Sequence, residues 1–378
     1  MKRLAPSERM PAPVPTISAP VHGGPDALGV PRFDFSTNSN ACGPCPQALA
    51  AVQQADATRY PDPAYTALRQ SLAEFHGVSP QRVLLAGSAS EFIFRITAWA
   101  AGQGACTVHL PEHHYGDYAR AAQALGLRCE TASSGDENAA RPTASSQVTL
   151  AWACEPSSPL GQPHRDWPRW LMDGSAPAAQ GAHTLVQDRA YAPLRLSGES
   201  ALTDAQLDQV WQLFSPNKAL GLTGVRAAYV IAPCQGVTRA RGQKVPDVSA
   251  LLQMAPSWPV GAHGVAMLQA WVEPEVQAWL GDSLQTLRDW KALQIGLLGA
   301  LGWTCLPSDA NFFCARPAPL QGAMADDAAA RWTAELARLR QAGIKLRDTA
   351  SFGLPGHARL GVLSPAAQDA LRATLATG

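Results

Sequence analysis

The sequence lacks the features of several large classes of protein. No uninterrupted apolar run reaches the roughly 20 residues that a helix needs to span a bilayer. The 30 basic and 30 acidic residues cancel, so the net charge does not favour nucleic acid or an anionic membrane as a partner. There is no P-loop, no GxGxxG fingerprint and no internal repeat. What remains is a globular chain of 378 residues, 46% hydrophobic, which is long enough for a large core and two lobes.

The cysteines do not form a disulfide framework. Most of the eight lie scattered in apolar runs, which favours reduced thiols in the cytosol. Cys42 and Cys45 have the spacing of a redox dithiol, but a proline follows at once and nothing else in the chain supports redox chemistry.

Two further absences concern the N-terminus and metals. Met1-Lys-Arg precedes a run of prolines rather than an apolar segment, so we expect residues 1–21 to be a disordered tail of a cytoplasmic protein. His113 and His114 are adjacent, so their side chains point apart, and no carboxylate or cysteine completes a site around them. We therefore expect no metal.

One stretch, Ser215-Pro-Asn-Lys218-Ala-Leu-Gly-Leu-Thr-Gly-Val-Arg226, indicates chemistry. A lysine attacks an aldehyde only as the neutral amine, which an apolar surround favours. An arginine two turns downstream suits a bound anion. Pyridoxal phosphate combines an aldehyde with a phosphate. From these residues alone, a surface lysine with an ion-paired arginine remains the alternative.

The pattern of apolar segments predicts an α/β fold. Buried strands are expected at 82–86, 105–110, 148–153, 183–187 and 227–232, with helices at 47–55, 64–75 and 92–101. From about residue 256 the pattern changes, and helices are expected at 262–280, 282–301 and 325–341, with a strand-rich piece around 308–314. This division predicts a larger domain followed by a smaller one.

Several motifs follow expected strands, where ligands collect in open parallel sheets. The turn Gly87-Ser-Ala-Ser-Glu91 leads into a helix, an arrangement that suits an anion or a simple serine cap. Tyr115 is placed to lie flat against a planar ring, and Asp188 to pair with a ring nitrogen or to cap a helix. Arg347 and Arg359 lie in apolar runs, so each needs an anionic partner, either a ligand or a structural salt bridge.

Taken together, these motifs resemble the fold-type I pyridoxal-phosphate enzymes of the class I/II aminotransferase superfamily. From about His22 to the C-terminus, the chain is most similar to the histidinol-phosphate aminotransferase branch and, within it, to the L-threonine O-3-phosphate decarboxylases of cobalamin synthesis. The resemblance implies a mainly parallel central sheet with helices on both faces and a smaller α+β C-terminal domain. It implies an N-terminal arm at 22–46, a large cofactor-binding domain at 47–255 and a small domain at 256–378.

The resemblance also implies roles for individual residues. Lys218 would carry the cofactor and move protons, Asp188 would pair with its pyridine nitrogen, and Tyr191 would hydrogen-bond its phenolic oxygen. The other implied cofactor contacts are Ala89, Ser90, Tyr115, Ser158, Ser215, Asn217, Arg226 and, from the neighbouring subunit of a homodimer, Tyr60. The implied substrate contacts are His22, Gly23, Asn38, Asn40, Arg347 and Arg359.

The chain departs from the family pattern at two of these positions. Ser158 stands in the loop Glu155–Gly161 where the family has an asparagine beside the phenolic oxygen, and a hydroxyl is shorter with a single donor. Asn217 stands where a serine or threonine usually precedes the lysine. Both changes leave room for a specialised substrate.

The resemblance implies a small phosphorylated amino acid as the substrate. The motif His22-Gly23-Gly24 also begins the cobalamin-pathway decarboxylases, where the histidine lies at the substrate phosphate. This favours decarboxylation of L-threonine O-3-phosphate to (R)-1-aminopropan-2-yl phosphate. Transamination with 2-oxoglutarate, as by a histidinol-phosphate aminotransferase, is the alternative. A non-catalytic binding module with the same fold is more remote, because such proteins often lose the lysine.

Overall fold

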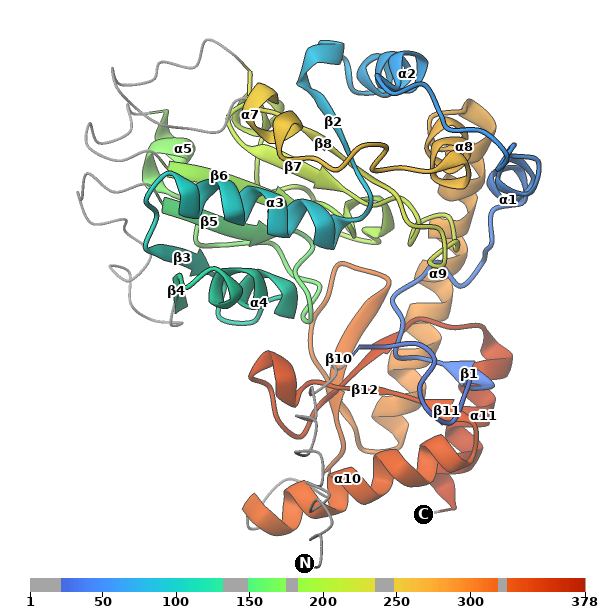
Figure 1. Cartoon of the computed structure of the whole chain (residues 1–378). Helices are drawn as coiled ribbons and strands as arrows, with labels where there is room; N and C mark the ends of the chain where they lie inside the picture. The colour runs from blue at the N-terminus through green and yellow to red at the C-terminus, as the bar shows by residue number, and fades with distance from the viewer. Residues whose placement is uncertain (1–21, 132–148, 175–182, 235–247, 319–324, 378) are drawn as a thin grey trace, which may run out of the picture.

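The protein is described by a computed structural model that covers residues 22–131, 149–174, 183–234, 248–318 and 325–377 (Figure 1). The tail expected at residues 1–21 lies outside this part of the chain. In the described residues, no helix combines the length and the apolar character needed to cross a membrane.

A seven-stranded sheet forms the centre of the larger part of the molecule (Figure 1). Its strands are β2 (Val83–Ala86), β3 (Thr107–Leu110), β4 (Arg128–Thr131), β5 (Thr149–Cys154), β6 (His183–Asp188), β7 (Trp211–Phe214) and β8 (Ala228–Ile231). Their order is β2-β8-β7-β6-β5-β3-β4, and β8 runs in the direction opposite to the other six strands. The α/β class and the mainly parallel sheet expected from the sequence are therefore confirmed.

Helices cover both faces of this sheet because alternate strand residues point to opposite sides. Leu84 and Val230 pack on one face, and Leu85 and Tyr229 pack on the other. The first face is covered by α3 (Ala89–Gly102), α4 (Gly116–Ala124) and α7 (Val248–Gln253). The second is covered by α2 (Thr66–His76), α5 (Arg169–Asp173), α6 (Asp204–Leu207) and α8 (Ala262–Trp271), and α1 (Pro46–Gln53) packs against α8.

A smaller antiparallel sheet lies near the C-terminal helices (Figure 1). Its strands, in the order β12-β13-β10-β9, are β12 (Arg347–Asp348), β13 (Ala358–Gly361), β10 (Phe312–Arg316) and β9 (Thr304–Cys305). The helices of this part are α9 (Pro274–Ala300), α10 (Ala325–Gln341) and α11 (Pro365–Ala376). The N-terminal arm joins it, because β1 (Phe33–Asp34) pairs in parallel with β11 (Ile344–Lys345).

The boundary between the two long helices differs from the one expected at residue 281. The break falls at 272–273, and Pro274 begins α9. Proline suits the first helical position because the amide it lacks would have no partner there. Gly281 instead lies inside α9, which a helix tolerates at a modest cost in stability.

The position of α8 bears on the division into domains. This helix contacts α1 and α2 of the larger part, whereas α9 runs from there to the smaller sheet (Figure 1). We therefore propose two domains that divide near the start of α9, somewhat later than the boundary at 255–256.

Candidate functional site

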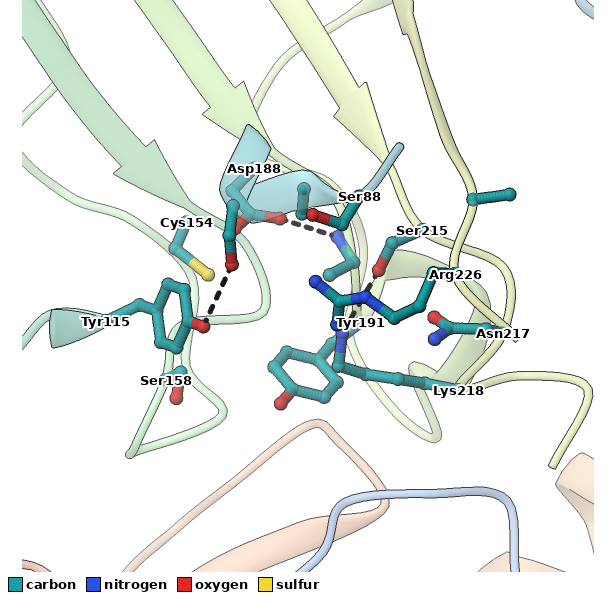
Figure 2. Close-up of a pocket in the computed structure, with 14 residues that line it drawn as sticks. Ser88, Tyr115, Cys154, Ser158, Asp188, Tyr191, Ser215, Asn217, Lys218 and Arg226 are labelled. Atoms are coloured by element: carbon teal, nitrogen blue, oxygen red, sulfur yellow. Dashed lines mark hydrogen bonds between the residues drawn. The ribbon is translucent and has the colours of Figure 1, made fainter. Parts of the chain in front are cut away.

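Polar side chains gather at one edge of the seven-stranded sheet. The parallel strands β5 and β6 end in register at Cys154 and Asp188, and β7 ends beside them at Phe214. The antiparallel strand β8 begins at this same edge, which places Arg226 there. Fourteen residues from these strand ends and the following loops line a single pocket (Figure 2).

This pocket brings together most of the predicted cofactor residues. It is lined by Ala89, Ser90, Tyr115, Ser158, Asp188, Tyr191, Ser215, Asn217, Lys218 and Arg226, and also by Ser88, Cys154, Ala190 and Ala227. The empty space of the pocket is about 610 Å³ when its open mouth is counted.

Lys218 lies beside a hydroxyl group and an aromatic ring (Figure 2). Its Nζ donates a 3.0 Å hydrogen bond to Ser215 Oγ and lies 5.4 Å from the centre of the Tyr191 ring. The amide of Asn217 donates to the backbone oxygens of Thr223 and Val225, at 3.5 and 3.3 Å. Asn217 therefore shapes the turn that leads from the lysine to Arg226.

Asp188 is a buried carboxylate held by two donors. The hydroxyl of Tyr118 donates to Asp188 Oδ2 at 2.7 Å, and the backbone N–H of Ala190 donates to Oδ1 at 2.9 Å. Burial raises the pKa of Asp188, whereas these hydrogen bonds and the charge of Lys218 act to lower it. A cationic group beside this carboxylate would favour its charged form.

These donors and acceptors fit the pyridoxal phosphate implied by the resemblance. Asp188 suits a protonated ring nitrogen, and Lys218 suits an aldehyde. Ser88 Oγ caps the first turn of α3 by accepting from the N–H of Glu91 at 3.1 Å, and Ser90 lies in that turn. The start of this helix and Arg226 would supply the dipole and charge that attract phosphate.

Two predicted substrate residues lie on the neighbouring sheet, facing each other in register on β12 and β13. Arg359 is buried, and its guanidinium donates to Ser158 Oγ at 3.3 Å and to the backbone oxygen of Ser36 at 2.9 Å. Its Nε has no hydrogen-bond partner among the described residues. Burial and the charge of Arg359 lower the pKa of Arg347 to about 10. Two cationic groups so close together favour an anionic ligand between or beside them.

The N-terminal arm carries the other predicted substrate residues. The His22 ring lies 6.4 Å from the Tyr115 ring, and Gly24 N donates to Ser36 Oγ at 2.9 Å. A Cβ on Gly23 would lie 2.2 Å from the Ser36 backbone oxygen, so only glycine fits there. Ser36 thereby links this motif to Arg359.

Asn38 and Asn40 differ in what their side chains contact. Asn38 is buried, and neither polar atom of its amide has a partner in the described part of the chain. Asn40 donates to Ala219 O at 3.0 Å and to Ser283 Oγ at 2.8 Å. The structure thus places Asn40 as a support of the lysine turn and leaves Asn38 with free hydrogen-bonding groups.

Tyr60 lies outside the pocket. Its side chain is 78% exposed and stacks on Trp258 with ring centres 4.5 Å apart. A contact between Tyr60 and the cofactor of a neighbouring subunit stays a prediction.

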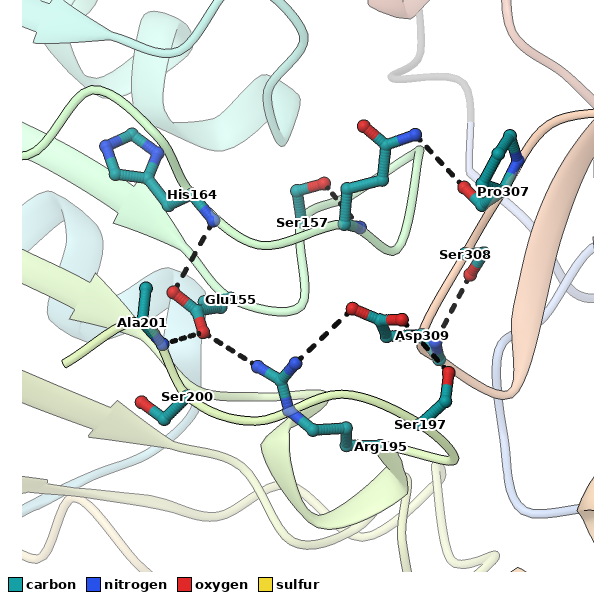
Figure 3. Close-up of polar contacts among 12 residues, drawn as sticks. Glu155, Ser157, His164, Arg195, Ser197, Ser200, Ala201, Pro307, Ser308 and Asp309 are labelled. Carbon is teal, nitrogen blue, oxygen red and sulfur yellow. Dashed lines mark hydrogen bonds and ion pairs between the residues drawn. The ribbon is translucent and has the colours of Figure 1, made fainter. Parts of the chain in front are cut away.

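A polar network supports the loop that carries Ser158 (Figure 3). The buried Glu155 accepts hydrogen bonds from Arg195 at 2.8 Å and from Ala201 N at 2.7 Å. Arg195 also lies 3.6 Å from Asp309, which precedes β10, and Asp309 N donates to the Gly161 oxygen at 2.7 Å. The network therefore ties the loop to the smaller sheet.

Tyr118, Cys154 and this network were missed by the sequence analysis. Tyr118 is fully buried and stacks on Trp152, so in the sequence it is indistinguishable from a core residue.

No cluster of metal ligands is found in the described residues. None of their groups of histidines, cysteines and carboxylates has the three or more members that could hold an ion.

Tyr118→Phe should lower kcat about tenfold, the equivalent of one hydrogen bond to a charged group. The ring and its stacking on Trp152 are kept, but Asp188 loses a donor that lowers its pKa. Steady-state kinetics of the loaded enzyme would measure the change. Tyr229→Phe is the control, because it removes a buried hydroxyl that contacts His76 and Trp271 instead. Equal effects of the two changes would contradict a specific role for Tyr118.

A family model described as aminotransferase class I and II matches residues 31–375. Among curated proteins, the histidinol-phosphate aminotransferase of Jannaschia sp. (strain CCS1) is 28% identical over 357 residues, covering 90% of this chain and 89% of that protein. Histidinol-phosphate aminotransferase 2 of Burkholderia mallei (strain ATCC 23344) is 27% identical, with 94% of each chain covered.

Solved structures share the fold. The histidinol-phosphate aminotransferase of Sinorhizobium meliloti, in complex with pyridoxal-5'-phosphate, superposes with a TM-score of 0.71 at 21% identity, covering 90% of each chain. L-threonine-O-3-phosphate decarboxylase from Porphyromonas gingivalis gives a TM-score of 0.69 at 19% identity, covering 91% of this chain and 98% of that one.

Proposed function

Because the chain belongs to the family of class I and II aminotransferases, which depend on pyridoxal phosphate, we propose that it decarboxylates L-threonine O-3-phosphate. The observation that carries the proposal is the link from His22-Gly23-Gly24 through Ser36 to Arg359. It joins the motif that favours a substrate phosphate to a buried arginine beside the cofactor pocket. The substrate class is a small amino acid with a phosphate group.

Each of three side chains in the pocket would have its own role in the proposed reaction. Bound pyridoxal phosphate supplies a ring that accepts the electron pair of a bond broken at the substrate's Cα. Lys218 would hold the cofactor through its amine and then carry the proton that reaches Cα. Asp188 would keep the ring nitrogen protonated, and Tyr191 would donate to the phenolic oxygen.

Arg347 and Arg359 would decide which bond breaks. They would fix the substrate by its anionic groups and so orient the bonds at Cα toward the bound cofactor. If they held the distal phosphate, the carboxylate would stay free of a partner, which would favour loss of CO₂. If they held the carboxylate, the Cα–H bond would be the one exposed, which would favour transamination.

The second candidate is a transamination of the histidinol-phosphate type. The curated relatives described above favour it, since both are named histidinol-phosphate aminotransferases. We also propose a homodimer in which Tyr60 reaches the cofactor of the partner, because this exposed ring is held outward by Trp258.

Incubation of the purified, cofactor-loaded protein with each substrate separates the two candidates. With O-phosphothreonine we expect CO₂ and aminopropanyl phosphate in equal amounts, without any need for 2-oxoglutarate. With histidinol phosphate and 2-oxoglutarate we expect no glutamate. Formation of glutamate without release of CO₂ from O-phosphothreonine would replace the first candidate by the second.

A further inference from the structure

The two adjacent histidines between β3 and α4 make different contacts. His114 Nδ1 lies 2.9 Å from the Pro111 oxygen of its own loop. His113 Nδ1 lies 2.8 Å from the Phe352 oxygen, 239 positions away in the chain. Because a carbonyl oxygen can only accept, Nδ1 of His113 carries the proton and donates it. This hydrogen bond connects the loop that carries Tyr115 with the smaller sheet.

Phe352 supports both arginines of the proposed substrate site. Its buried ring lies 4.7 Å from the guanidinium carbon of Arg347 and 5.6 Å from that of Arg359. The preceding residue takes part as well, because Ser351 Oγ accepts from Arg347 at 2.8 Å. The position of this turn therefore contributes to the positions of both cationic groups, beside the hydrogen bonds of Arg359 to Ser158 and Ser36.

The turn itself is short. Ala350–Phe352 forms a single 3-10 turn between β12 and β13, and Gly353 ends it with φ of 77°. Within the turn, Phe352 N donates to Thr349 O at 2.9 Å. Thr349 Oγ1 also donates to the backbone oxygens of Leu354 and His357. Turns of this length have weak intrinsic stability, so contacts from outside the connection add to these bonds in fixing where the turn lies. His113 supplies such a contact and packs 3.6 Å from the site of a Cβ on Gly353.

We propose that His113 is a positioning residue for substrate binding. Its Nδ1–H fixes the Phe352 carbonyl and, through the Phe352 ring, the two guanidinium groups that take the anionic part of the substrate. The inference rests on the proposed function only in assigning Arg347 and Arg359 to a substrate anion. It adds a link between the loop beside the cofactor and the groups that select a phosphate-bearing substrate.

The test compares His113→Ala, His113→Asn and His114→Ala in the cofactor-loaded protein. Calorimetry measures the dissociation constant of inorganic phosphate, and kinetics give KM and kcat with whichever substrate the wild type uses. His113→Ala should raise both the phosphate dissociation constant and KM about three- to tenfold, as expected for one lost hydrogen bond. We expect kcat and the dissociation constant of the cofactor to stay within about twofold of the wild-type values. The absorption maximum of the bound cofactor should not shift.

The other two variants show whether weaker phosphate binding is due to the lost hydrogen bond of His113. The asparagine amide can occupy the place of Nδ1, so His113→Asn should restore phosphate binding, while His114→Ala should match the wild type. The inference is overturned if His113→Ala binds phosphate normally, if asparagine fails to restore binding, or if His114→Ala weakens it equally. Wild-type protein that does not bind phosphate would overturn it as well. Failure to turn over either substrate would instead count against the proposed function, and the phosphate measurement would still decide the role of His113.

Discussion

Replacing Lys218 with alanine will reduce turnover by more than about 10³-fold, the scale of losing an essential nucleophile. No other amine lines the pocket among the described residues, so nothing can take over the covalent attachment of the cofactor. The wild-type protein should be yellow and should bleach on treatment with borohydride. The variant should be colourless, and mass spectrometry of the reduced wild type should place the label on the peptide that contains Lys218.

Lys291 provides the control for this experiment. It is also a buried amine, and burial lowers its pKa to about 8, yet it donates to the Ala310 oxygen at 2.8 Å and lies outside the pocket. A lowered pKa alone would make Lys291 reactive. Lys291→Met should therefore keep the label on Lys218. A label on Lys291, or full activity of Lys218→Ala, would overturn the assignment of the site.

Asp188→Ala will slow the reaction on the order of 10³-fold while leaving the cofactor attached, the scale seen when one fixed electrostatic group is removed. In the proposed arrangement, the ring nitrogen would lose its charged partner without this carboxylate, and the ring would become a weaker electron acceptor. Measurements of kcat should show the loss, and borohydride should still label Lys218. The carboxylate is buried and already positioned by Tyr118, so solvent cannot replace it.

Asp188→Asn separates charge from shape. The asparagine keeps an oxygen that can accept from Tyr118 but carries no negative charge. A loss as large as that of Asp188→Ala assigns the effect to the charge. An unchanged rate in either variant would remove Asp188 from the proposed mechanism.

The part of the site that lies close together in sequence could be predicted from it. Ser215, Lys218 and Arg226 belong to one stretch, and a strand-turn-helix pattern marked Ala89 and Ser90. The structure places all five in one pocket because β2, β7 and β8 bring their loops to the same edge.

Contacts between distant segments could not be predicted in this way. Tyr118 looks like a core residue, and only the pairing of β5 with β6 and the packing of α4 bring it to Asp188. The hydrogen bond from His113 to Phe352 depends on how the two sheets meet. No local sequence pattern predicts how the two sheets contact each other, because this contact follows from tertiary packing rather than from the periodicity of apolar residues.

Helix boundaries were the weakest part of the fold prediction. The buried side chains of α9 recur every three to four residues on both sides of Gly281, so the helix continues through this glycine. Pro274 marks the start of the helix, but the prediction placed a single helix across it, from 262 to 280.

The hydrogen bonds around Asp309 have a consequence for how the molecule unfolds. This residue is held by Leu196 N and Ser197 Oγ from one part of the chain, and its own N–H is bound to the loop at Gly161. If the smaller sheet becomes disordered, the segments that flank the pocket therefore lose their hydrogen bonds to Asp309. The parts of the molecule around the two sheets should melt in a single cooperative transition, and a local loss of order near β10 should disturb the loops that line the pocket before either part has unfolded.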